Sequence, residues 1–365
     1  MKVCVFGTRG FPYIQGGVEK HCECLYPLIA ADGQWDVVVF RRKPYVSKRS
    51  LQHYDGIRFI DLPSTRYKGF EAMIHSFLAT ICCLWIRPDI VHIHNIGPAL
   101  FSPLLRFARI KVVLTYHSPN YEHEKWDFFS RNLLKLSEKF SLWAASAIIF
   151  VNDLQRRKFN GKISGKSCFI PNGIQPPVFD YDEDYLHSIG VEKNKYVLAV
   201  GRITPEKGFD YLIKAFKSAD IHGFKLVIAG GVEGEQSYYE SLKSEAGADK
   251  VVFTGYINGK PLAQLFTNAA LFVQSSYNEG MSIVMLEAMS YGLPMQASDI
   301  PPNKALSLPE KNYFKAGDEQ ELTQRLQQSL AADEGRISYQ NLEAYDWKKI
   351  AAQTLLQAYQ IALEN

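Results

Sequence analysis

Cysteine is scarce in this 365-residue chain and forms no paired metal-binding pattern. The six cysteines lie inside apolar segments. Cys22 and Cys24 form one CxC pair, and the sequence contains no second CxC or CxxC pair. Structural zinc sites need a second such pair, or histidines at a matching spacing. We therefore expect reduced core thiols in a cytoplasmic protein, and no metal site.

Long hydrophobic runs are also absent. The longest, residues 70–86, contains Glu71, His75, Ser76 and Thr80, whereas a membrane span needs roughly 20 apolar residues. We expect it to form a packed helix. The first residues, MKVCVFG, run directly into a glycine turn without a basic region or cleavage site, so we expect no signal peptide.

A complete dinucleotide fingerprint is missing from the segment GTRGFPYIQGGVEKHCE, residues 7–23. The GxGxxG spacing is not met, and the next predicted strand ends in Arg41 and Arg42 rather than in an acidic residue. This argues against a nicotinamide-dependent dehydrogenase. The segment instead predicts a long loop that brings Gly16 and Gly17 to a helix N-terminus, where backbone N–H groups favour an anion. A plain turn is the alternative.

Charge is divided unevenly along the chain. Residues 1–175 carry 24 Lys and Arg against 13 Asp and Glu, a net charge of +11, whereas the remainder carries 17 against 25, a net of −8. A basic half favours an anionic partner, such as a membrane surface or a phosphorylated lipid. Nucleic acid is disfavoured, because no nucleic-acid-binding motif is present and the basic residues are dispersed.

Short runs rich in Val, Ile and Leu alternate with helical stretches, which is typical of parallel strands joined by helices. The rhythm stops at the acidic, proline-bearing stretch around residues 169–185 and then restarts. We predict an α/β protein of two Rossmann-like doubly wound domains, residues 1–175 and 176–345, with a closing helix at 346–365.

Two loops of the second half carry candidate ligand-binding residues. The sequence GRITPEKG, residues 201–208, follows a predicted strand and offers Arg202 and Lys207 to a diphosphate. In NEGMSIVMLEAM, residues 278–289, Glu279 precedes a helix that begins near Ser282, and Glu287 lies in its second turn. Both carboxylates can then border one crevice, although a lone helical Glu is also explained by solvation.

Together these motifs resemble the retaining GT-B glycosyltransferases of family 4, also called group 1. The carriers are the E-x7-E spacing of Glu279 and Glu287, the GRITPEKG loop, the PNGI segment at 171–174 and the Gly16-Gly17 loop. The resemblance spans the whole chain in order. The opening segment further resembles the bacterial subgroup that builds surface polysaccharides and includes rhamnosyltransferases.

The resemblance implies a role for each matching residue. Arg202 and Lys207 would hold the donor diphosphate, Glu287 the ribose hydroxyls, and Glu279 the transferred sugar, close to the amides of Gly280 and Met281. His117 matches the histidine beside the donor sugar, with a structural histidine as the alternative. Gly16 and Gly17 would approach the leaving phosphate or the acceptor, as part of a cleft across which the two domains face each other.

Some positions depart from the family pattern or need another explanation. Asn120 and Gln175 stand where relatives carry a carboxylate, which puts acceptor contacts there in doubt. Asp180 and Asp182 have the spacing of a metal-diphosphate motif, but they lie in the predicted linker. His92 and His94 alternate toward one sheet face and are interpreted as structural or cleft-lining.

The sequence therefore predicts transfer of a hexose or deoxyhexose from a nucleoside diphosphate sugar to a saccharide or a lipid-pyrophosphate-linked saccharide. We expect retention of configuration, no cofactor and no metal, in the cytoplasm or at the inner face of the membrane. A nucleotide-sugar epimerase, a glycan phosphorylase and a non-catalytic nucleotide-sugar sensor remain alternatives. The base, the sugar, the acceptor, the linkage and the oligomeric state are not determined by the sequence.

Overall fold

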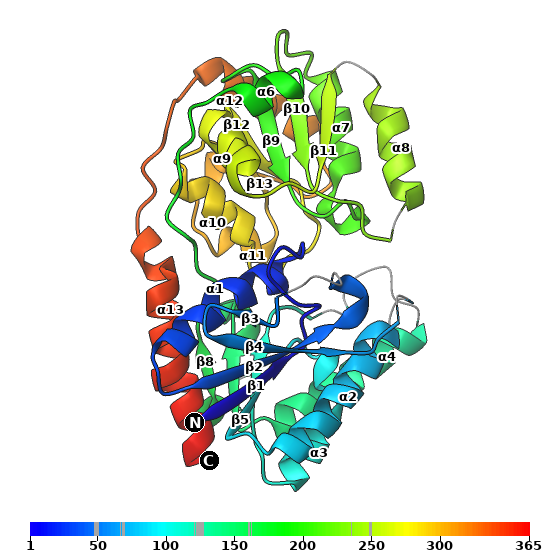
Figure 1. The fold of residues 1–365 in the computed structure, drawn as a ribbon. Coiled ribbons are helices and arrows are strands. Elements are labelled where there is room, and N and C mark those ends of the chain that lie inside the picture. Colours follow the sequence, from blue (N-terminus) through cyan, green and yellow to red (C-terminus); the bar gives the residue numbers. More distant parts are fainter. Residues whose placement is uncertain are drawn as a thin grey trace. The chain divides into compact units, whose positions relative to one another are not determined.

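The computed structural model divides the chain into two compact units (Figure 1). It describes residues 1–46, 51–65, 67, 70–119, 121, 128–159, 161, 163–234, 236–247 and 250–365. The N-terminal unit comprises Met1–Gly173 and Tyr345–Asn365, and the C-terminal unit comprises Ile174–Ala344. The chain therefore returns to its first unit at its end.

The N-terminal unit is built on an eight-stranded sheet in the order β3-β4-β2-β1-β5-β6-β7-β8. All neighbours pair in parallel except β3, which is antiparallel to β4. The strands are β1 (Lys2–Phe6), β2 (Asp36–Arg42), β3 (His53–Tyr54), β4 (Ile57–Leu62), β5 (Ile90–His94), β6 (Lys111–Tyr116), β7 (Ala147–Phe150) and β8 (Ser167–Phe169). The predicted apolar runs are all strands, and the structure adds the short β3 and β8.

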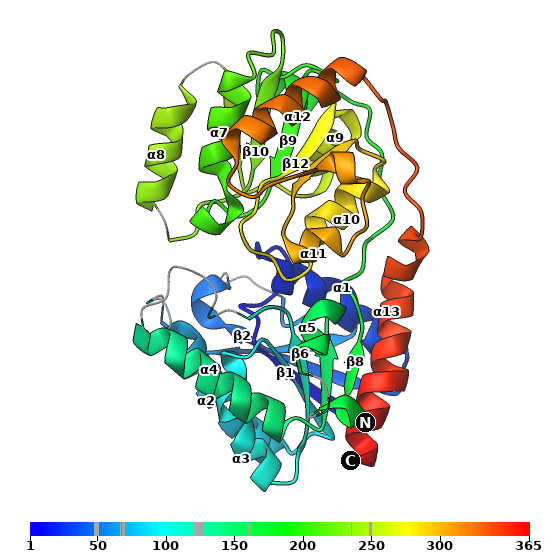
Figure 2. The same cartoon turned by 180° about the vertical axis from the view of Figure 1, so that it is seen from behind.

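Helices cover both faces of this sheet (Figures 1 and 2). They are α1 (Gly17–Ala31), α2 (Phe70–Ile86), α3 (Ser102–Phe107), α4 (Phe128–Ala144), α5 (Asp153–Arg157), α13 (Trp347–Gln353) and α14 (Gln360–Glu364), the last two joined by a π-helical turn at Thr354–Tyr359. Alternate residues of a strand point to opposite faces. Val3 and Val5 accordingly pack with α1 and the C-terminal helices, whereas Cys4 and Phe6 pack with α2, α3 and α4.

Residues 70–86 form a helix, as predicted, and its buried side is polar as well as apolar. Ala79 and Cys83 face the core together with His75, Ser76 and Thr80. No helix among the described residues is both long and apolar enough to cross a membrane.

The C-terminal unit repeats the architecture on a six-stranded parallel sheet, in the order β11-β10-β9-β12-β13-β14. The strands are β9 (Tyr196–Val200), β10 (Lys225–Ala229), β11 (Val251–Gly255), β12 (Leu271–Gln274), β13 (Met295–Ser298) and β14 (Tyr313–Phe314). The helices are α6 (Asp184–Ser188), α7 (Phe209–Ser218), α8 (Gln236–Ala246), α9 (Gly259–Asn268), α10 (Ile283–Ser290), α11 (Pro301–Lys304) and α12 (Glu319–Ala332). Both units thus confirm the prediction of Rossmann-like α/β domains.

Strand order indicates where each unit can bind a ligand. In the N-terminal unit, strands β2 and β4 are added on one side of β1, and β5 and the following strands on the other, so the strand order reverses between β1 and β5. In the C-terminal unit it reverses between β9 and β12. Open α/β sheets bind ligands outside the carboxyl ends of the strands at such a reversal. The two glycine loops predicted from sequence follow β1 and β9 directly, and therefore begin at these points.

Candidate functional site

The loop Gly201–Gly208 connects β9 to α7 and is fixed against the end of β12. It contains a short 3-10 turn at Pro205–Lys207, and Gly208 adopts a φ of 63°. A Cβ atom at Gly208 would lie 2.3 Å from the carbonyl oxygen of Ser275. The Ser275 hydroxyl also donates a hydrogen bond to the Lys207 carbonyl, at 2.8 Å. Glycine is therefore required at position 208 for conformation and for close packing.

Lys207 and Glu279 meet beside this loop. The Nζ atom of Lys207 lies 2.5 Å from Oε1 of Glu279, and the two side chains are 15% and 12% exposed. Gln274 Nε2 and Ser276 Oγ donate to the same oxygen, each at 2.6 Å. Three donors on one carboxylate oxygen fix the position of Glu279 at the carboxyl end of β12.

Arg202 follows β9 as predicted but has a different partner from Lys207. Its Nη1 atom donates to Oε2 of Glu233 at 2.7 Å, and its Nη2 atom lies 4.0 Å from Glu206. Glu233 belongs to the loop after β10. Sequence analysis did not single it out, although an acidic residue just after a strand and the pair Gly230-Gly231 is a usable signal.

The remaining residues of the E-x7-E segment lie where the sequence predicted. Ser282 is the N-cap of α10, and its hydroxyl accepts from the backbone N–H of Met285 at 3.4 Å. Gly280 and Met281 precede it and are half-buried, and Glu287 lies half-buried within α10. Glu279 is thus a loop residue and Glu287 a helix residue.

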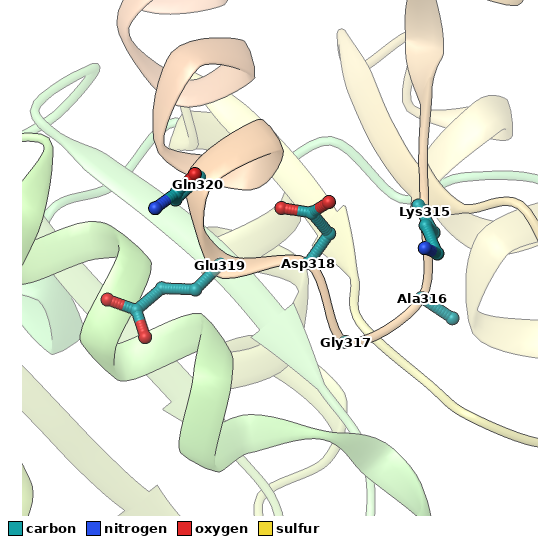
Figure 3. A pocket seen from close by; sticks show the side chains of 6 residues that line it. All are labelled: Lys315, Ala316, Gly317, Asp318, Glu319 and Gln320. Atoms are coloured by element: carbon teal, nitrogen blue, oxygen red, sulfur yellow. The ribbon is translucent and has the colours of Figure 1, made fainter.

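A separate pocket is lined by residues 315–320, between β14 and the start of α12 (Figure 3). Asp318 is the N-cap of α12 and accepts from the backbone N–H of Glu321 at 2.9 Å. None of the sequence-predicted site residues line this pocket. It is nevertheless adjacent to their loop, because the ring of Tyr277 lies 3.0 Å from where a Cβ atom of Gly317 would be.

In the N-terminal unit, a buried carboxylate closes the first glycine loop on itself. Oε1 of Glu19 accepts from the backbone N–H of Arg9 at 3.0 Å and from the Thr8 hydroxyl at 3.3 Å. Gly16 has a φ of 148°, and a Cβ atom there would lie 2.0 Å from Oε2 of Glu19. The φ of Gly16 therefore disfavours any other residue there, whereas a Cβ atom at Gly17 would meet nothing within 4 Å.

His117 follows β6 and belongs to a buried chain of hydrogen bonds. Its Nε2 atom lies 3.0 Å from Nδ1 of His94, the last residue of β5. Nε2 of His94 lies 2.6 Å from the hydroxyl of Tyr26 on α1. Sequence analysis proposed His117 as a site residue and His94 as structural or cleft-lining, but it gave no reason to connect them or to include Tyr26.

Two further histidines, His92 and His21, lie in the same interior. Nε2 of His92 is 2.7 Å from the Thr115 hydroxyl, and its Nδ1 is 3.0 Å from the hydroxyl of Tyr359 in the C-terminal segment. Nδ1 of His21 lies 2.9 Å from Oδ1 of Asn172. Burial lowers the pKa of His21 to about 4 and that of His92 to about 3. Burial also holds the pKa values of His94 and His117 well below the usual range, so these imidazoles are neutral at pH 7.

His21, His94 and His117 form the cluster among the described residues that could hold a metal ion. One ring nitrogen of each lies within 4.8 Å of the others, and all three side chains are buried. Neutral imidazole is a good ligand for zinc or nickel. One ring nitrogen of His94 and one of His117 are hydrogen-bonded to each other, and a metal that used these two nitrogens would have to break that bond.

Two further sequence predictions concern Asn120 and the pair Asp180 and Asp182. Asn120, the predicted acceptor-side residue, falls outside the residues that the structure describes. Asp182 is ion-paired with Lys260 at 2.7 Å, and Oδ1 of Asp180 accepts from the backbone N–H of Asp182 at 3.0 Å. Both lie on the irregular segment before α6.

Comparison with known proteins matches two successive family models to almost the whole chain. Residues 15–176 match "Glycosyltransferase Family 4", and residues 183–345 match "Glycosyl transferases group 1". The chain belongs to the group 1 and family 4 glycosyltransferases.

Two curated relatives illustrate the range of similarity to this glycosyltransferase. An uncharacterized glycosyltransferase of Methanocaldococcus jannaschii is 41% identical over 140 residues, which is 36% of each chain. The aligned part therefore spans about a third of that relative. Phosphatidyl-myo-inositol mannosyltransferase of Mycobacterium leprae is 27% identical over 94% of this chain and 92% of its own.

Solved structures share the fold over the whole length of the glycosyltransferase. Sucrose-phosphate synthase of Thermosynechococcus elongatus superimposes with a TM-score of 0.80 at 21% identity, covering 100% of both chains. HepE of Anabaena in complex with UDP-glucose gives a TM-score of 0.78 at 17% identity, covering 97% of this chain and 98% of that one. The fold is thus that of GT-B glycosyltransferases.

Proposed function

We propose that this glycosyltransferase moves a hexose or deoxyhexose from a nucleoside diphosphate sugar to a hydroxyl of a saccharide, with retention of anomeric configuration. The observation that carries the proposal is the pairing of Lys207 with Glu279 at the carboxyl end of β12. A cation and a hydrogen-bonding carboxylate side by side suit a ligand that joins a phosphate to a sugar.

Each residue is assigned one part of the reactants. Lys207 and Arg202 bind the diphosphate, Glu279 the hydroxyls of the transferred sugar near Gly280 and Met281, and Glu287 the ribose. Lys207 and Arg202 are ion-paired to Glu279 and Glu233 in the structure. We therefore expect the diphosphate to compete with these carboxylates for the two cations.

In the N-terminal unit, His117 is assigned to the donor sugar. Gly16 and Gly17 are assigned to the leaving phosphate or the acceptor. Of these two, Gly17 is the stronger candidate for a ligand contact, because local packing does not require glycine there. Asn120 keeps its predicted acceptor-side role.

The reaction needs no covalent enzyme intermediate. The bond between the anomeric carbon and the diphosphate oxygen breaks, and the acceptor oxygen forms its bond on the same face. The acceptor proton passes to the departing phosphate. The protein positions the reactants and neutralises the developing charge, so neither a cofactor nor a metal is invoked.

The acceptor is assigned by charge and by similarity. A net charge of +11 on residues 1–175 favours a lipid-pyrophosphate-linked saccharide at an anionic membrane surface, in the synthesis of a bacterial surface polysaccharide. The resemblance of the opening segment to rhamnosyltransferases favours a deoxyhexose donor. UDP-glucose, bound by HepE, belongs in the donor panel.

Nucleotide release from a panel of nucleotide sugars, with and without saccharide acceptors, tests the reaction. Acceptor-dependent release is expected. An epimer formed without acceptor, phosphate-dependent cleavage, or binding alone would instead favour an epimerase, a phosphorylase or a sensor.

Calorimetry tests whether Glu287 binds the ribose and Glu279 the transferred sugar of the donor. Glu287→Ala should weaken binding of the bare nucleoside diphosphate, and Glu279→Ala should spare that affinity while lowering turnover. Equal losses of nucleotide affinity would contradict the assignment.

A further inference from the structure

The outer side of α2 carries an apolar stripe along its whole length. Phe70, Ile74, Phe77 and Trp85 are exposed and recur at helical spacing, and Trp85 is 87% exposed. The opposite side of the helix packs into the core through Ala79 and Cys83. A helix that is apolar on its solvent side as well as on its core side indicates a surface that another apolar phase covers.

The outer side of α4 combines an aromatic stripe with a basic one. Phe129, Leu136, Phe140 and Trp143 are exposed and share one side of the helix. Arg131, Lys135 and Lys139 are exposed at intervals of four residues, in a row beside them. This is the pattern of helices that lie in the plane of a membrane interface, with basic side chains at the level of the headgroups.

Helix α3 joins these two stripes into one surface. Phe107 is 74% exposed, and its ring lies 5.9 Å from that of Trp143, over which the guanidinium of Arg106 lies at 4.8 Å. On the other side, Phe77 of α2 packs 5.3 Å from Phe101, just before α3. Figures 1 and 2 show α2, α3 and α4 together on one side of the sheet. We call these exposed side chains of the three helices the aromatic face.

Acidic side chains are turned away from the aromatic face. The two acids within α2, α3 and α4 are Glu71 and Glu138, and both are half-buried. Glu71 pairs with Arg42 at 3.0 Å, and Glu138 accepts from the hydroxyl of Tyr116 at 2.5 Å. The exposed charge on these helices is therefore positive. Positive charge is complementary to the headgroups of anionic lipids.

We propose that the aromatic face docks on an anionic lipid bilayer. Aromatic side chains enter the interface, while Arg131, Lys135 and Lys139 contact the lipid headgroups. This inference deepens the proposed function and rests on it for the identity of the acceptor. Docking would also bring the acceptor near the site. Helices α2 and α4 follow parallel strands, so their N-terminal ends lie at the carboxyl edge of the sheet, which also carries His117. A lipid-linked saccharide beside these helix ends is close to that edge.

Co-sedimentation of the full chain with vesicles tests the docking. Vesicles of equal parts phosphatidylglycerol and phosphatidylcholine should bind the protein at low salt, and binding should weaken steeply as salt rises. Replacing Arg131, Lys135 and Lys139 by Gln should lower the partition coefficient on the order of a hundredfold. The matched control replaces Lys193, Lys217 and Lys243, which are exposed in the C-terminal unit, and should leave binding unchanged.

The apolar part is tested by Trp85→Gln, which should lower vesicle binding about tenfold. Its control is Leu356→Gln, since Leu356 is 70% exposed on the C-terminal segment, away from α2, α3 and α4. Trp85 is almost fully exposed, so its replacement should not disturb folding. Thermal melts of all variants verify this.

Other outcomes would overturn the docking inference. These are equal binding to neutral vesicles, no binding at low salt, or a lipid-free dimer that Trp85→Gln converts to a monomer. Nucleotide release that depends on a water-soluble saccharide acceptor, measured without vesicles, reports the proposed function separately. If acceptor-dependent release persists and docking fails, only the membrane surface is wrong, whereas docking without any turnover would count against the proposed activity.

Discussion

The Nδ1 atom of His94 lies 3.0 Å from the Nε2 atom of His117, and the other ring nitrogen of His94 lies 2.6 Å from the Tyr26 hydroxyl. A neutral imidazole has one donor and one acceptor nitrogen. The direction of the hydrogen bond from Tyr26 therefore determines the tautomer of His94, and His94 in turn determines which nitrogen of His117 carries the proton. His94 and Tyr26 are positioning residues for His117.

Tyr26→Phe keeps the ring but removes the hydroxyl that orients His94. We expect turnover to fall about tenfold, in line with the loss of one buried hydrogen bond to a site residue, with little change in KM. The pH dependence of kcat should shift, because His117 would no longer be restricted to one tautomer. His94→Gln should have the same effect. A change in KM alone, with an unaltered pH profile, would indicate a structural role instead.

Lys207→Ala should remove charge stabilisation of the leaving diphosphate of roughly 3 kcal/mol, on the order of a hundredfold in kcat. Arg202→Ala should act similarly. The double variant Lys207→Ala/Glu279→Ala should lose less than the two single variants combined, because the side chains are in direct contact. Lys243→Ala, on the exposed surface of the same unit, is the control. Turnover equal to wild type in Lys207→Ala would exclude this loop from the diphosphate site.

Activity should survive treatment with EDTA. Asp180→Asn/Asp182→Asn should also transfer sugar normally, because Asp182 is already neutralised by Lys260 on an irregular segment. Added zinc tests the histidine cluster separately. If zinc binds there and displaces the hydrogen bond between His94 and His117, it should inhibit sugar transfer. Loss of activity on chelation, with recovery in manganese, would establish a metal-dependent reaction.

The protein should lose stability as the pH falls from 6.5 toward 3. The pKa of His21 is lowered to about 4 and that of His92 to about 3, from 6.5 for an unperturbed imidazole. The unfolded chain therefore takes up protons before the folded one, and protonation favours unfolding. For His21 alone the loss amounts to roughly 3 kcal/mol once the pH is below 4.

Denaturation midpoints measured by tryptophan fluorescence across this pH range test the effect. His92→Gln should flatten the dependence. His222→Gln should not, because the His222 side chain is 91% exposed. Parallel curves for wild type and His92→Gln would show that this imidazole does not control acid stability.

Local sequence patterns predicted the sheets, because buried parallel strands are continuous apolar runs, and the loops after β1, β9 and β10 begin with glycine. They also placed Glu279 in a loop and Glu287 on a helix, since Ser282 is a recognisable N-cap. The pattern did not indicate that Gly16 is also constrained by its φ of 148° and by the Glu19 carboxylate three residues later.

Contacts between distant residues were not predictable in the same way. Arg202 pairs with Glu233, and His92 contacts Tyr359 across a separation of 267 residues. Neither pair leaves a periodic signal, because such contacts depend on strand order. The charge of residues 1–175 predicted an anionic partner but not the location of the aromatic face, since the stripes on α2 and α4 become visible only when exposure separates outer residues from inner ones.

The return of the chain to its first unit has a consequence for biosynthesis. Trp347, Ile350 and Tyr359 belong to the core that also contains Val3 and Leu25, yet they are synthesised only after the whole second unit. The C-terminal unit can complete its fold during translation, as domains generally do, while one face of the first unit's sheet is still covered only by α1. We expect nascent chains that stop before residue 345 to contain a folded second unit and an aggregation-prone first one.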